Sequence, residues 1–295
     1  MKVDIVIVSY NTRDLLKRCL SALRRENDVQ VWVVDNASQD GSADMVEKEF
    51  PWVHLVRNSW NMGFARANNK AADLGKSPYV LFLNPDTVVG ADTVHRMVNF
   101  MEEHPRAGVV GCRLVNMDGT YQTSYQYFPT PFSVLFYRRS LFTTLFPNNP
   151  ISRRYFMVDG KLREPKRVDW VRGAAMMIRR DLWDRLCGFD ERFFLYLEDV
   201  DLCYRVWQLG WEVWYLPSAE VLHLLGGSTR KFYFRAETHH HFSMLKFFVK
   251  RYNLPFWVYI ILFGGMGLHL WWVFFVGMLR NLISSSFKGW EEEAC

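Results

Sequence analysis

Residues 3–35 read VDIVIVSYNTRDLLKRCLSALRRENDVQVWVVD, and this stretch indicates the fold class. Val3 to Val8 form a mostly β-branched run, typical of a strand that is buried on both faces of a sheet. Apolar residues then recur at helical spacing from Leu15 to Leu23, after Thr12, which can cap a helix. A second short apolar run, Gln30 to Val34, follows. The stretch therefore predicts a strand–helix–strand unit.

The same alternation continues to residue 115. We expect further strands at Val53–Arg57, Tyr79–Leu83 and Gly108–Val115, and helices at Ala43–Phe50, Phe64–Leu74 and Thr93–Glu103. Strands that alternate with helices at this spacing predict an α/β fold with a doubly wound, mostly parallel sheet and helices on both faces. In such sheets, ligands bind outside the carboxyl ends of the strands.

Polar side chains collect at four of these predicted strand ends. They are Ser9-Tyr10-Asn11, Asp35, Asn61 to Arg66 and Asn84 to Asp86. Asx residues also form ordinary turns, but four such groups at one sheet edge favour a binding site. The sequences GxGxxG and GxxxxGK[ST] are absent, which argues against a dinucleotide Rossmann site and a P-loop. We therefore expect side chains and backbone amides to hold a nucleotide.

Residues 188–205, GFDERFFLYLEDVDLCYR, place acids among aromatic and aliphatic residues. Burying carboxylates in such company is costly unless they are paired or used, and a helix start accounts for only one or two of them. Asp201 lies four residues before Arg205, the spacing of an intrahelical ion pair. We expect a strand at Val168–Ile178 and a helix from about Glu198 to Gln208. Strands or extended segments follow at 212–216 and 221–223.

Composition limits the partners of the chain. Its 295 residues carry a net charge of +5, but between Arg138 and Arg180 eleven Lys and Arg stand against three acids. A basic region suits phosphates or anionic lipid headgroups, whereas nucleic acid is disfavoured because no nucleic-acid-binding motif accompanies it. The five cysteines form no CxxC pair, which predicts mostly buried free thiols in a reducing compartment, and the N-terminus resembles no signal peptide.

The C-terminal part has a different character. Residues 231–253 are expected to form an amphipathic helix, on which His239 to His241 are interpreted as ordinary helix-face residues. Leu254 to Leu279 contains no charged residue, so we expect it to be embedded in a membrane, as a span or as a re-entrant bend at Gly264–Gly267. A buried core helix is the competing interpretation. Residues 280–295 are a polar tail.

Seven blocks in order resemble family 2 glycosyltransferases with a GT-A fold, and most of all bacterial rhamnosyltransferase-type enzymes of cell-surface polysaccharide synthesis. The blocks are VSYNTRDLLKRCLSAL, VVDNASQDGS, NMGFARANNKA, LFLNPDTVV, GAAMMIRRDLW, GFDERFFLYLEDVDLCYR and VLHLLGGST. The resemblance covers residues 1–230. It implies a catalytic domain there, with a nucleotide-binding half at 1–115 and an acceptor half at 116–230.

The resemblance implies roles for the donor side. Ser9, Asn11 and Asp35 match positions that contact ribose and base, and Arg66 sits where a cation meets the diphosphate. Asn61 and Asn84 belong to the same donor-binding blocks. Asp86 and His223 match ligands of Mg²⁺ or Mn²⁺. Asn84 replaces the first acid of the usual DxD motif, and Pro85 follows it, so we expect weaker metal affinity.

On the acceptor side the resemblance implies that Asp199 is the general base and that Glu198 orients the acceptor or the loop. Trp170, Arg172 and Gly173 match positions that contact the donor sugar and the acceptor. The implied activity is an inverting, metal-dependent transfer of a sugar from a nucleotide diphosphate to a lipid-linked glycan.

The NPDT variant of the metal motif favours dTDP-L-rhamnose as the donor, through the resemblance alone, and UDP-sugars stay open. The implied location is the cytoplasmic face of the inner membrane. A non-catalytic nucleotide-sugar-binding membrane scaffold is the alternative, although a mere binder has no use for a base. A soluble nucleotidyltransferase is disfavoured by the uncharged C-terminal run.

Overall fold

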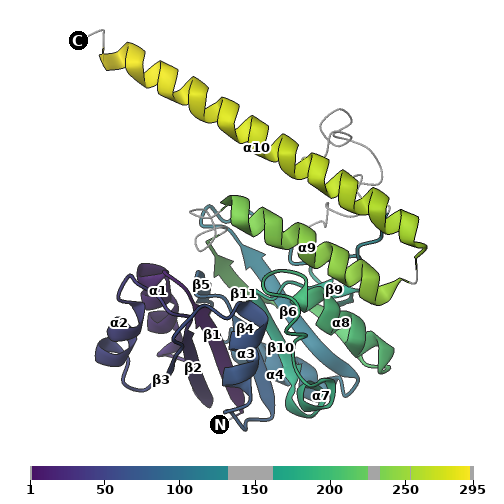
Figure 1. The fold of residues 1–295 in the computed structure, drawn as a ribbon. Coiled ribbons are helices and arrows are strands. Elements are labelled where there is room, and N and C mark those ends of the chain that lie inside the picture. The colour runs from purple at the N-terminus through teal and green to yellow at the C-terminus, as the bar shows by residue number, and fades with distance from the viewer. Residues whose placement is uncertain (1, 132–161, 225–232, 253, 293–295) are drawn as a thin grey trace. The chain divides into compact units, whose positions relative to one another are not determined.

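The structure, a computed structural model, describes residues 2–131, 162–224, 233–252 and 254–292. The chain divides into two compact units, residues 1–231 and residues 232–295. The described part of the first unit is a sheet covered by helices, and that of the second is two helices (Figure 1). Most of the basic region at 138–180 lies outside the described residues.

A nine-stranded sheet forms the centre of the first unit. Its order is β3-β2-β1-β4-β10-β6-β11-β5, with β8 paired to β11. In that order the bounds are His54–Arg57, Val29–Asp35, Val3–Ser9, Tyr79–Leu83, Ala175–Arg179, Ala107–Val115, Glu212–His223 and Thr87–Val89, and β8 is Lys166–Arg167. The first four strands are parallel, but β10 runs antiparallel to both β4 and β6. The sheet is therefore mixed: β6 and β11 are parallel to each other and run in the direction of β1 to β4, whereas β10, β5 and β8 run in the opposite direction. The predicted, mostly parallel sheet is thus interrupted by antiparallel strands.

Both faces of the sheet are covered. The side-chain alternation along β1 sends Ile5 and Ile7 into one apolar core and Val6 and Val8 into the other. The first core is completed by α1 (Arg13–Leu23), α2 (Ser42–Glu49) and α4 (Thr93–Glu103), and the second by α3 (Phe64–Ala72), α7 (Arg180–Leu186) and α8 (Glu198–Gln208). Burial on both sides explains why the strands are continuous apolar runs.

Two predicted strands differ in the structure. The run Val168–Ile178 is broken: β9 (Trp170–Val171) pairs with β7 (Tyr125–Gln126) in a small separate sheet, and only β10 joins the main sheet. Between β9 and β10, the Gly173 N–H donates to a side-chain carboxylate of α8 and not to the carbonyl of a neighbouring strand. The segments 212–216 and 221–223, in contrast, belong to one strand, β11, whose register shifts between Leu216 and Glu220.

The second unit contains α9 (Tyr233–Arg251) and α10 (Phe256–Glu292), and α10 continues beyond Leu279 into the predicted polar tail. Over the residues that the structure describes, no helix combines the length and the apolar character needed to cross a membrane.

Candidate active site

The carboxyl ends of β1, β2 and β4 lie side by side. Ser9 at the end of β1 is in register with Asp35 at the end of β2, and Ile7 is in register with Leu83, the last residue of β4. The polar groups that follow these strands therefore meet at one edge of the sheet, as predicted.

Asn36, directly after β2, holds the loops at this edge together. Its backbone N–H donates to the Ser9 carbonyl oxygen at 2.8 Å, and its side-chain amide donates to Asn61 Oδ1 at 2.8 Å and to the Gly63 carbonyl oxygen at 3.1 Å. Its Oδ1 accepts from the Met62 N–H at 3.1 Å. Asn61 Oδ1 also accepts from the Gly63 N–H at 3.0 Å, so this oxygen organises the loop.

Asp35 is the buried carboxylate of the predicted donor site. Its Oδ2 accepts from the Ser38 N–H at 3.0 Å, but its Oδ1 is buried and, among the described residues, has no hydrogen-bond partner. A buried acceptor left unpaired costs about 1–3 kcal/mol, so this oxygen is suited to a donor on a ligand. Asn11 is bonded to the same loop: its N–H donates to Ser38 Oγ at 3.0 Å and its Oδ1 accepts from the Gln39 N–H at 2.7 Å.

The predicted metal ligands Asp86 and His223 lie together. Residue 87 in β5 is in register with His223 at the end of β11, and this pairing leaves 3.4 Å between Asp86 Oδ1 and His223 Nε2. Both residues are buried. Gln122 orients the imidazole. Its Oε1 lies 2.8 Å from His223 Nδ1, and its Nε2 donates to the His223 carbonyl oxygen at 2.6 Å.

This geometry fits a divalent cation. Because Gln122 Oε1 can only accept, His223 Nδ1 carries the hydrogen, and in the neutral ring Nε2 keeps its lone pair toward Asp86. Such an outer hydrogen bond is the usual way of orienting a metal-binding histidine. Gln122 is a residue that sequence reasoning missed, since nothing in its sequence neighbourhood distinguishes it.

The donor edge is joined directly to the acceptor side. Asn84 follows β4, and its N–H donates to the Ala174 carbonyl oxygen, which precedes β10, at 2.9 Å. The neighbouring Gly173 N–H donates to Asp199 Oδ2 at 2.9 Å. The metal motif and the predicted base are therefore both hydrogen-bonded to the backbone of two adjacent residues, Ala174 and Gly173.

Glu198 and Asp199 are two neighbouring acids in the first turn of α8. Asp199 Oδ1 also accepts from the Val200 N–H at 2.8 Å. Burial raises the pKa of Asp199, against the lowering effect of these N–H groups and of Arg172. Burial and then the charge of Asp199 raise the pKa of Glu198 well above its usual range, and Glu198 Oε2 is buried with no partner among the described residues. Of the two acids, Asp199 is therefore the one that ionises first as pH rises.

The loop before this pair is docked on α3. The Phe64 N–H donates to the Phe194 carbonyl oxygen at 2.7 Å, and Gly63 lies so close that an added Cβ would stand 2.6 Å from that oxygen. Tyr196 and Leu197 have φ of 67° and 64°, the left-handed region that side chains rarely adopt. Strained backbone of this kind persists only where its surroundings impose it, as at functional sites.

The remaining predicted residues contact this loop or the segment 124–127. Arg66 forms an exposed ion pair with Glu191, with 2.8 Å between Nε and Oε2. Trp170 Nε1 donates to the Tyr127 carbonyl oxygen at 3.0 Å, and the Arg172 N–H donates to the Ser124 carbonyl oxygen at 3.1 Å. The ion pair predicted between Asp201 and Arg205 is present at 2.8 Å.

A model of the glycosyl transferase family 2 matches residues 4–186. The chain belongs to glycosyltransferase family 2. It is 30% identical, over 265 residues and 85% of each chain, to an N-acetylglucosaminyl-diphospho-decaprenol L-rhamnosyltransferase of Mycobacterium tuberculosis. It is 23% identical over 263 residues to the rhamnosyltransferase WbbL of Escherichia coli, covering 84% of this chain and 93% of that one. The predicted family and its likeness to rhamnosyltransferases are thereby confirmed.

Solved structures show that this family 2 glycosyltransferase has a GT-A-like fold. A mannosyltransferase of Pyrobaculum calidifontis, in complex with GDP-Man and Mn²⁺, superposes with a TM-score of 0.58 at 18% identity, covering 86% of this chain and 65% of that one. TarS of Staphylococcus aureus, in complex with UDP-GlcNAc, gives 0.55 at 17% identity, covering 86% and 68%.

Proposed function

We propose that this glycosyltransferase moves a sugar from a nucleotide diphosphate to a hydroxyl group of a lipid-linked glycan, with inversion at the anomeric carbon. The observation that carries the proposal is the position of Asp199, a partly buried carboxylate held by the Gly173 N–H beside the Asn84–Asp86 segment. A non-catalytic binder would have no use for an acid pair in which Glu198 is buried and Asp199 is partly buried.

Asp199 is the proposed base. Its two backbone N–H bonds fix the carboxylate, and its raised pKa makes it a stronger proton acceptor than an exposed Asp. As the acceptor oxygen bonds to the anomeric carbon, the bond from that carbon to the diphosphate oxygen breaks and the hydroxyl proton passes to Asp199. Glu198 stays protonated in this proposal, and Trp170 and Arg172 position the sugar and the acceptor.

Asp86 and His223 would hold Mg²⁺ or Mn²⁺, and Gln122 would orient the His223 ring toward the ion. The bound ion supplies positive charge that stabilises a departing diphosphate. Asn84 would contact the donor by its amide, and Arg66, now paired with Glu191, is placed to exchange that exposed partner for a phosphate.

For the donor nucleotide, Asp35 Oδ1 would accept from a pyrimidine N–H, while Ser9 and Asn11 contact the ribose. We assign dTDP-L-rhamnose as the donor, in keeping with the two relatives named as rhamnosyltransferases. The lipid-linked acceptor rests on the relative whose name includes diphospho-decaprenol.

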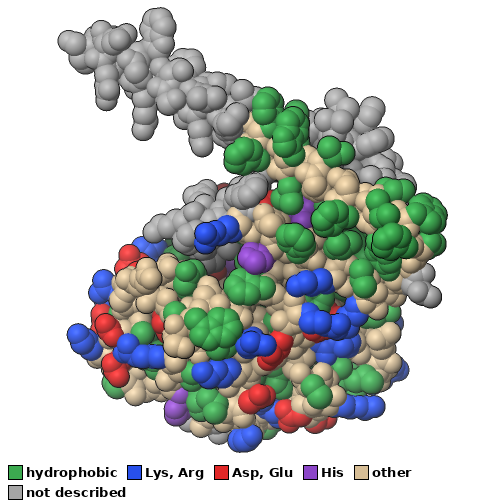
Figure 2. All heavy atoms as spheres, in the orientation of Figure 1, with side chains coloured by type: hydrophobic (Ala, Val, Ile, Leu, Met, Phe, Trp, Pro, Cys, Tyr) green, Lys and Arg blue, Asp and Glu red, His purple; other side chains and the backbone are tan. Residues whose placement is uncertain are grey.

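The second unit is proposed to lie against a membrane, on the cytoplasmic face of the inner membrane. The first part of α10 exposes large apolar side chains: Phe256 is 77% exposed, Leu268 72% and Trp271 62%. Figure 2 shows hydrophobic side chains gathered there. Exposed apolar and aromatic groups of this extent on one helix suit the interface of a lipid bilayer, where the acceptor resides.

A donor screen tests the activity. Purified protein with Mg²⁺ is incubated with dTDP-L-rhamnose, UDP-sugars and GDP-sugars, with and without a prenyl-diphosphate-linked N-acetylglucosamine. We expect transfer from dTDP-L-rhamnose, and its loss in Asp86→Ala. Transfer from a UDP- or GDP-sugar alone would overturn the donor assignment, and absence of any transfer would overturn the proposed function.

A sedimentation assay tests the proposed association of the second unit with a membrane. The full chain should pellet with vesicles that contain anionic lipid, and a chain ending at residue 253 should remain in the supernatant. Equal pelleting of the two chains would show that residues 254–295 are not the anchor.

A further inference from the structure

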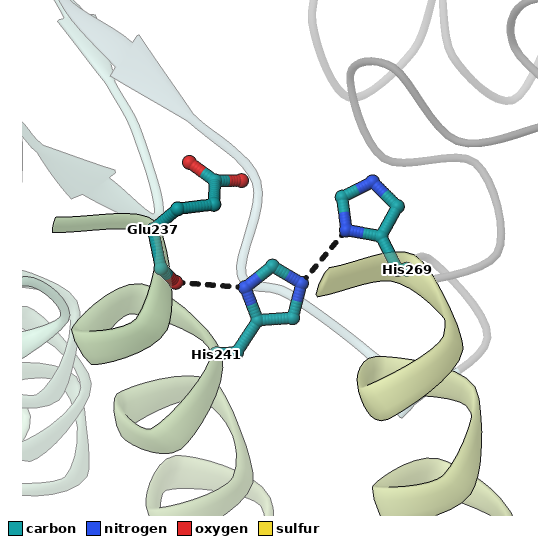
Figure 3. A group of neighbouring side chains, drawn as sticks. All are labelled: Glu237, His241 and His269. Atoms are coloured by element: carbon teal, nitrogen blue, oxygen red, sulfur yellow. Dashed lines mark hydrogen bonds between the residues drawn. The ribbon is translucent and has the colours of Figure 1, made fainter. Parts of the chain in front are cut away.

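The second unit contains a cluster of metal-ligating side chains that sugar transfer does not use. Glu237 and His241 lie four residues apart on α9, so they share one face of that helix, and His269 lies on α10 (Figure 3). Each offers one ligand atom, and these atoms lie within 4.8 Å of one another. The interpretation of residues 239–241 as ordinary helix-face positions does not hold for His241, which is buried.

Hydrogen bonds fix the orientation of the two imidazoles. His241 Nδ1 lies 2.8 Å from the Glu237 carbonyl oxygen, which can only accept, so Nδ1 carries the hydrogen. In the neutral ring His241 Nε2 then has its lone pair directed at His269 Nδ1, 2.9 Å away. An imidazole that donates one N–H to a carbonyl and turns its other nitrogen outward is typical of metal-binding histidines.

We propose that Glu237, His241 and His269 form a Zn²⁺ site that clamps α9 to α10. Two imidazole nitrogens, one carboxylate and a water molecule make a common four-coordinate zinc set, and nitrogen ligands disfavour Mg²⁺. With Zn–N distances of about 2.0–2.1 Å, tetrahedral ligand atoms stand roughly 3.3 Å apart. The two nitrogens therefore need to separate by only a few tenths of an ångström. The hydrogen of His269 moves from Nδ1 to Nε2, so the ring stays neutral and Nδ1 presents its lone pair to the metal.

Glu237 supplies the negative charge that a divalent cation requires, and its half-exposed side chain is free to turn toward the two rings.

Zinc titration of the full chain, without a histidine tag, tests the site. The protein carries Asp86→Ala, so that the proposed donor-site metal does not contribute. We expect one equivalent of Zn²⁺ to bind and Mg²⁺ not to displace it. His269→Gln and Glu237→Gln should each weaken binding by at least about tenfold.

His239→Gln, on the same helix but outside the cluster, is the matched control and should bind Zn²⁺ as the parent does. Absence of stoichiometric binding, or equal affinity of the parent and Glu237→Gln, would overturn the site. Helical circular dichroism of Glu237→Gln, whose side chain is only half-buried, reports that the variant is folded.

Discussion

At the scale of single residues, the two acids that open α8 differ in how their carboxylates are stabilised. Asp199 is held by two backbone N–H groups, whereas Glu198 is buried without such help at Oε2. The two acids therefore ionise at different pH, although they are adjacent in the sequence.

The rate of sugar transfer should rise with pH through a pKa above the ordinary range of Asp, because the base must be ionised.

Glu198→Gln should stabilise the protein at neutral pH. The raised pKa of Glu198 means that the folded protein keeps a proton that the unfolded chain loses above its ordinary pKa of 4.5, so stability falls as pH rises past that value. Gln cannot ionise and removes this loss. Melting temperatures from about pH 5 to about pH 8 should show an advantage of the variant that grows with pH. A variant less stable than the parent at the upper end would contradict the protonated state.

Gln122→Ala should weaken Mn²⁺ binding about 10- to 100-fold, because His223 loses the acceptor that orients its ring. The measurement is the Mn²⁺ dependence of nucleotide-sugar binding. Gln208→Ala, on the exposed face of α8, is the control and should bind Mn²⁺ normally. An unchanged Mn²⁺ dependence in Gln122→Ala would remove Gln122 from the metal site.

At the scale of elements, the contact between α3 and the loop before α8 positions the acid pair. Gly63→Ala should destabilise the protein by about 1–3 kcal/mol and lower transfer, since its φ is +84° and a Cβ would meet Phe194. Gly119→Ala is a matched control, because Gly119 has a φ of +79° but nothing within 4 Å of an added Cβ. Both variants carry backbone strain, so equal losses in denaturant unfolding would show that the Phe194 contact contributes nothing.

The elements also show which features a sequence can predict. Tyr79–Leu83 and Thr93–Glu103 have the predicted bounds, because the apolar pattern of their own residues indicates them. β5 was not predicted, since its three residues form a strand only by pairing with β11, far along the chain. The break in 168–178 likewise depends on Asp199, a partner that no local pattern reveals.

The site residues divide in the same way. Asp86 and His223 could be proposed from motifs, but their orientation by Gln122 could not, because that contact joins residues about a hundred positions apart. Three of the four described cysteines are buried, as expected, whereas Cys187 is exposed.

At the scale of the whole molecule, a buried ion pair ties β1 to α7. Asp4, fully buried in β1, accepts from Arg180 Nη2 and from the Ser77 N–H, both at 2.8 Å. Asp4→Asn should lower the free energy of unfolding by about 3–5 kcal/mol, because it leaves the Arg180 charge largely buried and uncompensated. Asp44→Asn, which breaks an exposed pair with Arg57, should cost less than about 1 kcal/mol. Similar losses in urea unfolding would contradict this account of the core.

The most direct test of the proposed chemistry compares Asp199→Asn with Glu198→Gln in single-turnover sugar transfer, with donor affinity measured in parallel. Asp199→Asn should lower the transfer rate by about 10²- to 10⁴-fold while binding the nucleotide sugar normally, because only proton acceptance is lost. Glu198→Gln, which mimics the protonated acid, should stay within about tenfold of the parent. Normal transfer by Asp199→Asn would contradict the assignment of Asp199 as the base.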